Sequence, residues 1–305
     1  MKKILFLFER SHYFDYASRS IEGYEIQQVS AWRRDIHPLL AKILRNLCYF
    51  TSRFALGKWR KQKKSYDLAI FTDVAVNRFT VKYIGKHPVA QRQILYYRNA
   101  LNKKAKKTVK IARKYGWEVY TYNTSDVKRY GLKYNSQCWN KDLAAKVELI
   151  TDVNHGVYFL GQVKSRYDTL IQIKRAMEKQ GIDCLFQLVS KNGEPETQKE
   201  RVSYKNYIIQ AKKSVALLDV VEEENWGLTL RPLEALFLKK KVVTNYTDMV
   251  NYDFYAAHKD NIFIITNNDL TGIKEFLETP FKEVDFDLDY YDNVAWMKRF
   301  VEEEN

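Results

Sequence analysis

The sequence predicts an α/β protein made of two tandem Rossmann-like, doubly wound domains. The chain has 305 residues, which suits two domains at about 100–200 residues each. Short apolar runs alternate with segments of helical periodicity, a pattern typical of a parallel sheet covered by helices. The alternation starts again near residue 153. We therefore expect domains at 1–152 and 153–289 facing a cleft, with 290–305 forming a terminal helix that can cross back to the first domain.

In the first domain, short apolar runs such as Asp67–Phe71 (DLAIF) predict buried parallel strands. Strands are expected at Lys3–Phe8, Tyr24–Ser30, Asp67–Phe71, Gln93–Tyr97 and Trp117–Tyr122, and helices at Pro38–Leu56, Val76–Gly85 and Lys103–Lys114. Gly116 is a helix-stop signal directly after the last of these helices.

In the second domain, the same alternation continues to the end of the chain. Strands are expected at Val157–Leu160, Asp183–Val189, Val215–Val220, Lys241–Thr244 and Asn261–Ile265, and helices at Tyr167–Lys179, Tyr204–Lys213, Leu230–Leu238, Leu270–Leu277 and Tyr290–Glu303. Lys191–Glu200 (KNGEPETQKE) is polar and contains Gly and Pro, so we expect a loop there.

The charge is unevenly distributed. Residues 1–150 hold 31 Lys and Arg against 11 Asp and Glu, a net charge of +20, whereas the rest of the chain is net acidic. Such asymmetry indicates that the first half meets a polyanionic partner. The start of the sequence reads better as a buried strand than as a secretory signal, and no apolar stretch of about 20 residues is present, so we expect neither a signal peptide nor a transmembrane helix. Three dispersed cysteines argue for a reducing compartment and against a disulfide framework.

The segment 215–246 carries the most informative pattern of the chain. It reads as a strand, an acidic loop, Gly227, a helix and a further strand. The start of a helix after a glycine is suited to a phosphate group, because its N–H groups and dipole face the ligand. Arg231 can add a bidentate phosphate contact, Thr229 a hydroxyl, and Glu234 a carboxylate for ribose hydroxyls. The alternative is a plain helix–strand connection with a surface Arg and Glu.

This segment resembles the donor-binding segment of GT-B glycosyltransferases, and in particular that of bacterial proteins of lipopolysaccharide and capsule assembly. The matching positions are Gly227, Leu228, Thr229, Arg231, Glu234, Ala235 and Leu236, followed by the lysine-led stretch 239–245. The resemblance implies a nucleotide-sugar donor, with Glu234 on the ribose and the turn at 227–231 near the diphosphate. Many retaining members carry a second Glu eight positions earlier, where this chain has Trp226, so the stereochemistry of transfer stays open.

A second motif, FLGQVKSR at 159–166, follows the first strand of the second domain. In GT-B enzymes the corresponding loop commonly holds a Gly and a basic residue that meet the donor diphosphate. The resemblance therefore implies a diphosphate-binding role for Gly161, Lys164 and Arg166. The alternative is a solvated helix start.

Candidates for a catalytic base follow strands of the first domain. His12 and Asp15 follow the first strand, and Asp73 follows the third. A carboxylate or imidazole at such a position can deprotonate an acceptor hydroxyl. Taken alone, each of the three fits a helix cap or a surface residue better than a catalytic base.

The sequence DFDLD at 285–289 is similar to the metal-binding DxD motif of the other glycosyltransferase architecture. Its acids alternate with apolar residues shortly before the terminal helix, a pattern that favours an extended linker. No cysteine–histidine cluster indicates a metal site either. We therefore expect no metal ligands.

Residues 36–64 combine basic and apolar side chains and contain no acid. The basic residues are Lys42, Arg45, Arg53, Lys58, Arg60, Lys61, Lys63 and Lys64. Such a segment can lie on an anionic membrane surface, or it can be an ordinary sheet-covering helix followed by a basic loop. Nucleic acid is the rival partner for the basic half, but the sequence contains no known nucleic-acid-binding module.

Together these features predict a metal-independent, hexosyltransferase-type glycosyltransferase, cytoplasmic and peripheral on the inner face of the cell membrane. It would transfer a sugar from a nucleoside-diphosphate donor to a glycan or lipid-linked acceptor in bacterial surface polysaccharide biosynthesis (capsule, lipopolysaccharide or exopolysaccharide). The donor is a substrate, and no further cofactor is expected. The alternative is a non-catalytic GT-B-like module that binds glycan or membrane in an assembly complex.

Overall fold

The computed structural model describes residues 1–8, 21–145, 152–222 and 226–302. The chain divides into two compact units: Met1–Gln137 together with Val294–Asn305, and Cys138–Asn293. The division at 137/138 falls earlier along the chain than the expected boundary after residue 152. The two units are called the N-terminal and C-terminal domains below.

The N-terminal domain is built on a six-stranded sheet of order β2-β1-β3-β4-β5-β6. The strands are β1 Lys2–Phe8, β2 Tyr24–Ser30, β3 Tyr66–Thr72, β4 Ala90–Tyr97, β5 Glu118–Thr121 and β6 Lys133–Tyr134. Neighbouring strands are parallel throughout, as the alternating sequence pattern predicted. The two-residue edge strand β6 was not expected, because two residues are too few to show a period.

The helices of this domain follow the expected order, with one break. They are α1 Pro38–Leu47, α2 Tyr49–Ser52, α3 Arg78–Lys86, α4 Lys103–Lys114 and α5 Thr124–Tyr130. The single helix predicted over 38–56 is divided at Cys48, whose backbone is extended. The Thr51 hydroxyl accepts the Cys48 N–H at 3.2 Å, which starts α2 as a separate helix.

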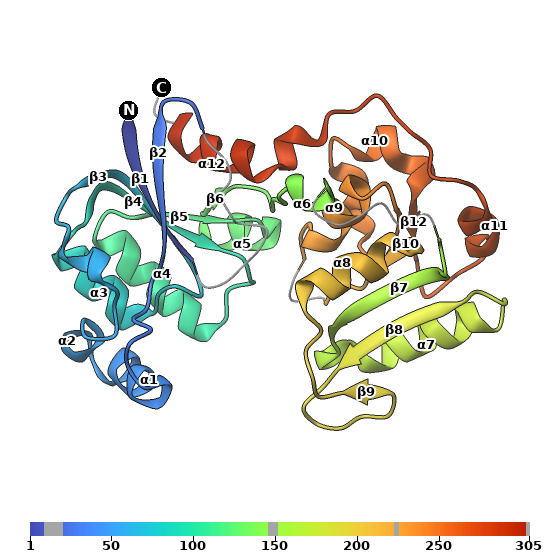
Figure 1. Ribbon diagram of the computed structural model, residues 1–305, viewed down its shortest axis with the longest axis horizontal. Helices are drawn as coiled ribbons and strands as arrows, with labels where there is room; N and C mark the ends of the chain where they lie inside the picture. The colour runs from blue at the N-terminus through green and yellow to red at the C-terminus, as the bar shows by residue number, and fades with distance from the viewer. Residues whose placement is uncertain (9–20, 146–151, 223–225, 303–305) are drawn as a thin grey trace. The chain divides into compact units, whose positions relative to one another are not determined.

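The last helix, α12 (Asn293–Glu302), packs on one face of the N-terminal sheet (Figure 1). The ring of Trp296 lies 4.9 Å from that of Tyr96, and the ring of Phe300 lies 4.9 Å from that of Tyr120. The opposite face carries the core shared with α3 and α4, including Phe71. Alternate strand residues therefore serve the two faces, as the two-residue period of a strand requires.

The C-terminal domain holds a second parallel sheet of six strands, in the order β12-β11-β10-β7-β8-β9. The strands are β7 His155–Gln162, β8 Cys184–Val189, β9 Thr197–Gln198, β10 Ser214–Asp219, β11 Lys241–Thr244 and β12 Ile262–Ile264. Read from β9, this is the 3-2-1-4-5-6 order of a doubly wound nucleotide-binding sheet. The short β9 lies inside the segment that we expected to be a loop.

Helices cover both faces of this sheet (Figure 1). They include α6 Asp142–Ala145, α7 Tyr167–Glu178, α8 Tyr204–Lys212, α9 Leu230–Phe237, α10 Tyr255–His258 and α11 Ile273–Glu278. Buried residues of α7 and α11 share a core with Phe159 and Leu218. On the other face, the ring of Tyr207 in α8 lies 5.7 Å from that of Tyr158 in β7. The sheet is therefore buried on both faces, which explains its continuous apolar strands.

Candidate functional site

The switch point of the C-terminal sheet lies between β7 and β10, and two arginines meet there. In open α/β sheets, ligands bind beyond the carboxyl ends of the strands at this point. Arg231, the second residue of α9, donates to the carbonyl of Leu218 at 3.0 Å and to that of Leu160 at 2.5 Å. Its guanidinium carbon lies 4.8 Å from the centre of the Phe159 ring. Arg231 thereby joins the ends of the two strands that define the switch point.

Arg166 reaches the same place from the turn after β7. It donates to the carbonyl of Val220 and, at 3.1 Å, to that of Gln162. Burial lowers the pKa of this guanidinium, and the nearby charge of Arg231 lowers it further. A Cβ at Gly161 would lie 3.1 Å from Cζ of Phe159 and 3.4 Å from Nη2 of Arg166, so a larger residue here would press on the Phe159 ring. The structure thus brings together Gly161, Arg166 and Arg231.

Glu234 lies deeper in the domain than the sequence suggested. Its side chain is 3% exposed, and its two oxygens accept hydrogen bonds from Tyr204 at 2.7 Å and Tyr207 at 2.6 Å. Burial raises the pKa of Glu234, while Arg231 and the tyrosine hydroxyls act in the opposite direction. In this arrangement the carboxylate holds two tyrosines, and its burial leaves little of its surface open to a ligand. Direct contact of Glu234 with a ribose stays a prediction.

The turn before α9 is held by buried polar contacts. Thr229 is the N-cap residue of α9, but its hydroxyl donates to Asp219 at 2.9 Å, so the threonine does not cap the helix. Asp219 is buried, and burial raises its pKa. Gly227 and Leu228 are also buried, and the Leu228 N–H donates to the hydroxyl of Tyr252 at 3.0 Å. The start of α9 therefore combines a fixed turn with an N-terminus that no side chain caps.

A basic cavity of about 370 Å³ lies at the carboxyl ends of β7 and β8. Four of its lining residues are cations: Lys164, Lys191, Lys199 and Arg201. Lys164 also pairs with Glu222 at 3.3 Å. The sequence pointed to Lys164 alone, because the polar composition of residues 191–200 indicated only a loop. Lys191, Lys199 and Arg201 could have been found from their place directly after strands, since residues that follow a strand lie at its carboxyl end.

In the N-terminal domain, Asp73 lies at the carboxyl end of β3. Its Oδ2 accepts a hydrogen bond from Asn99 at 2.8 Å, and Arg98 lies 3.8 Å from Oδ1. Within the described residues, Oδ1 is buried and has no hydrogen-bond partner. Burial raises the pKa of Asp73 above its ordinary value, against the effects of Asn99 and Arg98. The other two candidate bases, His12 and Asp15, lie outside the described residues.

The remaining sequence motifs have structural partners. Trp226 donates to the carboxylate of Asp248 and packs against Tyr246, so the position of the second Glu is filled by a packed indole. In the DFDLD stretch, Asp287 accepts from the Asp289 N–H at 2.7 Å, and Asp289 pairs with Lys141 at 2.6 Å.

Among the described residues, no three or more His, Cys, Asp or Glu side chains come together in a group that could hold a metal ion. None of the helices in this part of the chain has the length and apolar character of a membrane span.

Two parallel-sheet α/β domains of this kind define the GT-B fold of glycosyltransferases, and this chain has that fold. It is similar to an alpha-glucosyltransferase in complex with UDP and a 13-mer DNA containing a central A:G mismatch, with a TM-score of 0.56 and 14% identity over 99% of this chain and 95% of that one. It is also similar to AviGT4, a glycosyltransferase involved in avilamycin A biosynthesis, with a TM-score of 0.56 and 10% identity over 99% and 97% of the two chains. No protein-family model and no curated protein matches the sequence.

Proposed function

We propose that the protein is a glycosyltransferase that uses a nucleoside-diphosphate sugar as donor. The observation that carries the proposal is the basic switch point of the C-terminal sheet, where Arg166 and Arg231 join strand ends beside a cavity lined by four cations. A diphosphate carries its charge on oxygens that Lys and Arg side chains bind well. The GT-B fold of the chain agrees with this use of the site.

The proposed reaction assigns the base to Asp73. Its carboxylate takes the proton from an acceptor hydroxyl, and the acceptor oxygen forms a bond to the anomeric carbon of the donor sugar. The bond from that carbon to the diphosphate breaks, and its electron pair leaves with the diphosphate. Cations in the C-terminal domain are already in place before the reaction, and they stabilise the charge on the departing diphosphate as it develops. A carboxylate with an upshifted pKa is a stronger base than an ordinary one, which suits this role.

The finer assignment follows the sequence pattern. We propose a glycan or lipid-linked acceptor, a peripheral position on the cytoplasmic face of a membrane, and a role in bacterial surface polysaccharide synthesis. The strongly basic N-terminal half supports an anionic partner for that domain. The pattern from Gly227 to Leu236 supports the pathway.

Donor binding is tested by thermal unfolding of the full chain with UDP, GDP, ADP and CDP. A ligand at about 100 times its Kd stabilises the native state by about 2.7 kcal/mol, which raises the Tm by about 5–10 °C for domains of this size. We expect one nucleotide to do so, and the Lys191→Gln/Arg201→Gln pair to reduce the shift. The matched control is Arg175→Gln/Lys179→Gln, which removes the same charge from exposed positions of α7. If no nucleotide shifts the Tm, the donor site is refuted.

The same material distinguishes an enzyme from a binding module. Nucleotide sugars that share the stabilising base are incubated with the protein, and the released nucleoside diphosphate is measured. Release that is lost in Asp73→Asn supports catalysis. Nucleotide binding without release, even when acceptor glycans are supplied, would support the non-catalytic module instead.

A further inference from the structure

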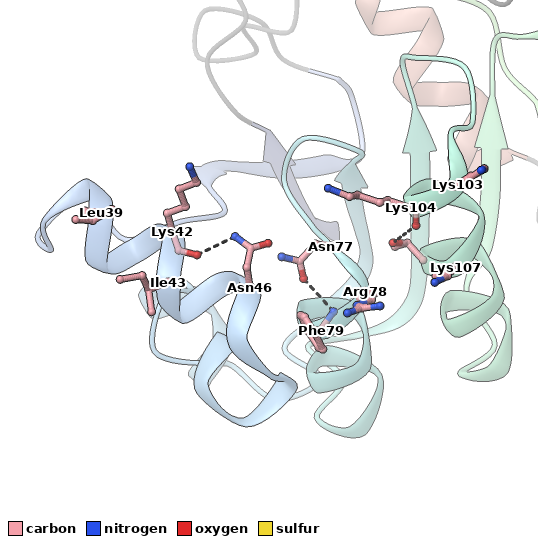
Figure 2. Close-up of a pocket in the computed structure, with 11 residues that line it drawn as sticks. Leu39, Lys42, Ile43, Asn46, Asn77, Arg78, Phe79, Lys103, Lys104 and Lys107 are labelled. Atoms are coloured by element: carbon pink, nitrogen blue, oxygen red, sulfur yellow. Dashed lines mark hydrogen bonds between the residues drawn. The ribbon is translucent and has the colours of Figure 1, made fainter.

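A second basic cavity lies in the N-terminal domain, away from the residues assigned to the donor. It has a volume of about 740 Å³ and lies between α1, the start of α3 and the first half of α4 (Figure 2). Its cations are Lys42 of α1, Arg78 of α3, and Lys103, Lys104 and Lys107 of α4. No acidic residue lines it, and within the described ranges no ion pair involves any of these five cations. The cavity therefore concentrates positive charge that no carboxylate among the described residues neutralises.

The walls of this cavity are fixed by hydrogen bonds to backbone groups. Asn77 donates to the carbonyl of Arg45 at 2.9 Å, which joins the end of α1 to the start of α3. Asn77 also accepts from the N–H of Phe79 at 2.9 Å, and Asn102 accepts from the N–H of Lys104 at 2.9 Å. The starts of α3 and α4 are thus capped by side chains. An anion in the cavity would meet lysine and arginine side chains on preformed walls, because the capped backbone amides are already bonded.

The rim of the cavity is apolar. Leu39 and Ile43 of α1 line it and are 60% and 51% exposed. Further large apolar side chains are exposed on α1, α2 and the turn that follows: Leu40, Leu47, Phe50 and Phe54. Single exposed apolar residues are ordinary, but a contiguous group marks an interaction surface. An amphiphilic anion matches a cavity whose lining combines exposed cations with exposed apolar side chains.

We propose that the cavity between α1, α3 and α4 binds the phosphate headgroup of an anionic membrane lipid, while the exposed apolar side chains of α1 and α2 insert among the acyl chains. The biological role of this site rests on the proposed function, since membrane binding would bring the enzyme to a lipid-linked acceptor. Duplex DNA would satisfy the same cations, but DNA offers no apolar phase for Leu39, Ile43 and their neighbours. The apolar rim therefore favours a lipid.

The test is sedimentation of the full chain with phosphatidylcholine vesicles, with and without phosphatidylglycerol, at low and high salt. We expect binding to the anionic vesicles alone, weakened by salt. The Lys103→Gln/Lys107→Gln pair should weaken it by about 30-fold, because each basic residue near the surface contributes about one factor of five. The control pair Lys110→Gln/Lys114→Gln removes the same charge from exposed positions of α4 outside the cavity. Equal weakening by both pairs would overturn the headgroup site, since it would indicate a diffuse basic surface.

Two further arms identify the source of the anion. Leu39→Ser/Ile43→Ser keeps every cation and should weaken vesicle binding about tenfold, since two apolar side chains no longer insert. No effect of this pair, or displacement of the protein by inorganic phosphate, would show a site for a soluble anion and overturn the lipid. Binding to duplex DNA that is tighter than binding to vesicles, and that is lost in the Lys103→Gln/Lys107→Gln pair, would overturn the lipid too.

The nucleotide-induced Tm shift is measured on the same variants, where it should be unchanged. Its absence would refute the donor site alone.

Discussion

Both domains are built on a parallel six-stranded sheet, yet the side chains at the carboxyl ends of their strands differ in kind. In the C-terminal domain, the ends of β7 and β10 are joined by Arg231 and Arg166, and the carboxylate of Glu234 beneath them has both oxygens bonded. Within the described residues, Asp73 at the end of β3 in the N-terminal domain keeps one buried oxygen without a hydrogen bond. At the C-terminal site, the buried atoms without a partner among the described residues are instead Nε of Arg166 and Nε of Arg231. The C-terminal site thus keeps two guanidinium donors unpaired, whereas the N-terminal site keeps one acid oxygen unpaired.

Under the proposed function, this difference would separate two tasks of one reaction. Bonds to backbone carbonyls fix the guanidiniums of Arg166 and Arg231 before a substrate arrives, which is the arrangement that stabilises a leaving group. An incompletely bonded carboxylate with a raised pKa has a free lone pair for a proton. The comparison predicts that substitutions in the first site chiefly change stability, whereas substitutions in the second chiefly change the rate.

The largest effect is expected for Arg231→Ala. The substitution removes bonds to Leu218 and Leu160 and leaves the buried carboxylates of Glu234 and Asp219 without their cation. Breaking a buried charge network by removing one partner costs about 3–5 kcal/mol. Chemical denaturation should show this loss in the unfolding free energy of the C-terminal domain.

The control for this prediction is Arg175→Ala, which removes an exposed arginine from α7. It should change the unfolding free energy by less than about 0.5 kcal/mol. A loss for Arg231→Ala as small as that of the control would show that the network is not needed for folding, and the contrast between the two domains would fail.

The second effect is a loss of rate in Asp73→Asn. An amide cannot take the acceptor proton, so sugar transfer should fall by about 10²–10⁴-fold while the protein stays folded. In the parent protein, kcat/KM should rise with pH along a limb whose pKa lies above the ordinary 3.8 of an aspartate, because burial raises it. That limb should be missing in the variant. A pH profile shared by both proteins would exclude Asp73 as the base, and Asp35→Asn, on an exposed partner of Arg33, is the control.

The raised pKa of Asp73 also predicts how this residue affects the free energy of unfolding as pH changes. Folded Asp73 binds its proton more tightly than unfolded Asp73, so its contribution to stability falls as pH rises from the ordinary pKa of 3.8 through the raised value. Asp73→Asn removes this cost. Above that window the variant should therefore unfold at the same or a higher denaturant concentration than the parent.

The third effect is smaller and tests the buried carboxylate. Tyr207→Phe removes the donor to Oε2 of Glu234 without changing the ring that packs on Tyr158. A buried acceptor left without its donor costs about 1–3 kcal/mol. Tyr167→Phe, whose hydroxyl bonds the exposed carbonyl of Pro195, is the matched control and should cost less than about 0.5 kcal/mol. If the two cost the same, Glu234 has another donor available and the network is looser than described.

Much of the fold could be predicted from the sequence because its strands are buried on both faces. A run such as Val215–Leu218 is apolar throughout, and such runs are typical of parallel strands under helices. The structure confirms two α/β domains with parallel sheets. The break at Cys48 could not be predicted from periodicity, because the apolar spacing continues across it and the break depends on one hydrogen bond to Thr51.

The site was less predictable than the fold, since it depends on how deeply each side chain is buried as well as on its place in the sequence. The pattern around Gly227 pointed to the turn before α9, and the structure brings Arg231 and Arg166 together beside Phe159. Helical spacing alone does not tell which side chain faces solvent, so the burial of Glu234 under Tyr204 and Tyr207 was not foreseen. Lys191 and Arg201 were missed because their segment lacks any period.

The smallest effect concerns an ion-pair cluster at the edge of the N-terminal sheet, far from the chemistry. Burial alone would raise the pKa of Glu118, but hydrogen bonds from Arg92 and Lys133 outweigh it and lower the pKa to about 2. A lowered carboxylate pKa contributes stability that is present above its ordinary value of 4.5 and is lost as pH falls toward about 2. Arg92 also bonds the carbonyl of Phe300, so the cluster helps to hold α12 on the sheet. Glu118→Gln should cost about 1 kcal/mol or less near neutral pH and nothing near pH 2, measured by denaturation across that range. A cost that does not change with pH would show that Glu118 acts through packing, and would leave the aromatic contacts of Trp296 and Phe300 as the attachment of the helix.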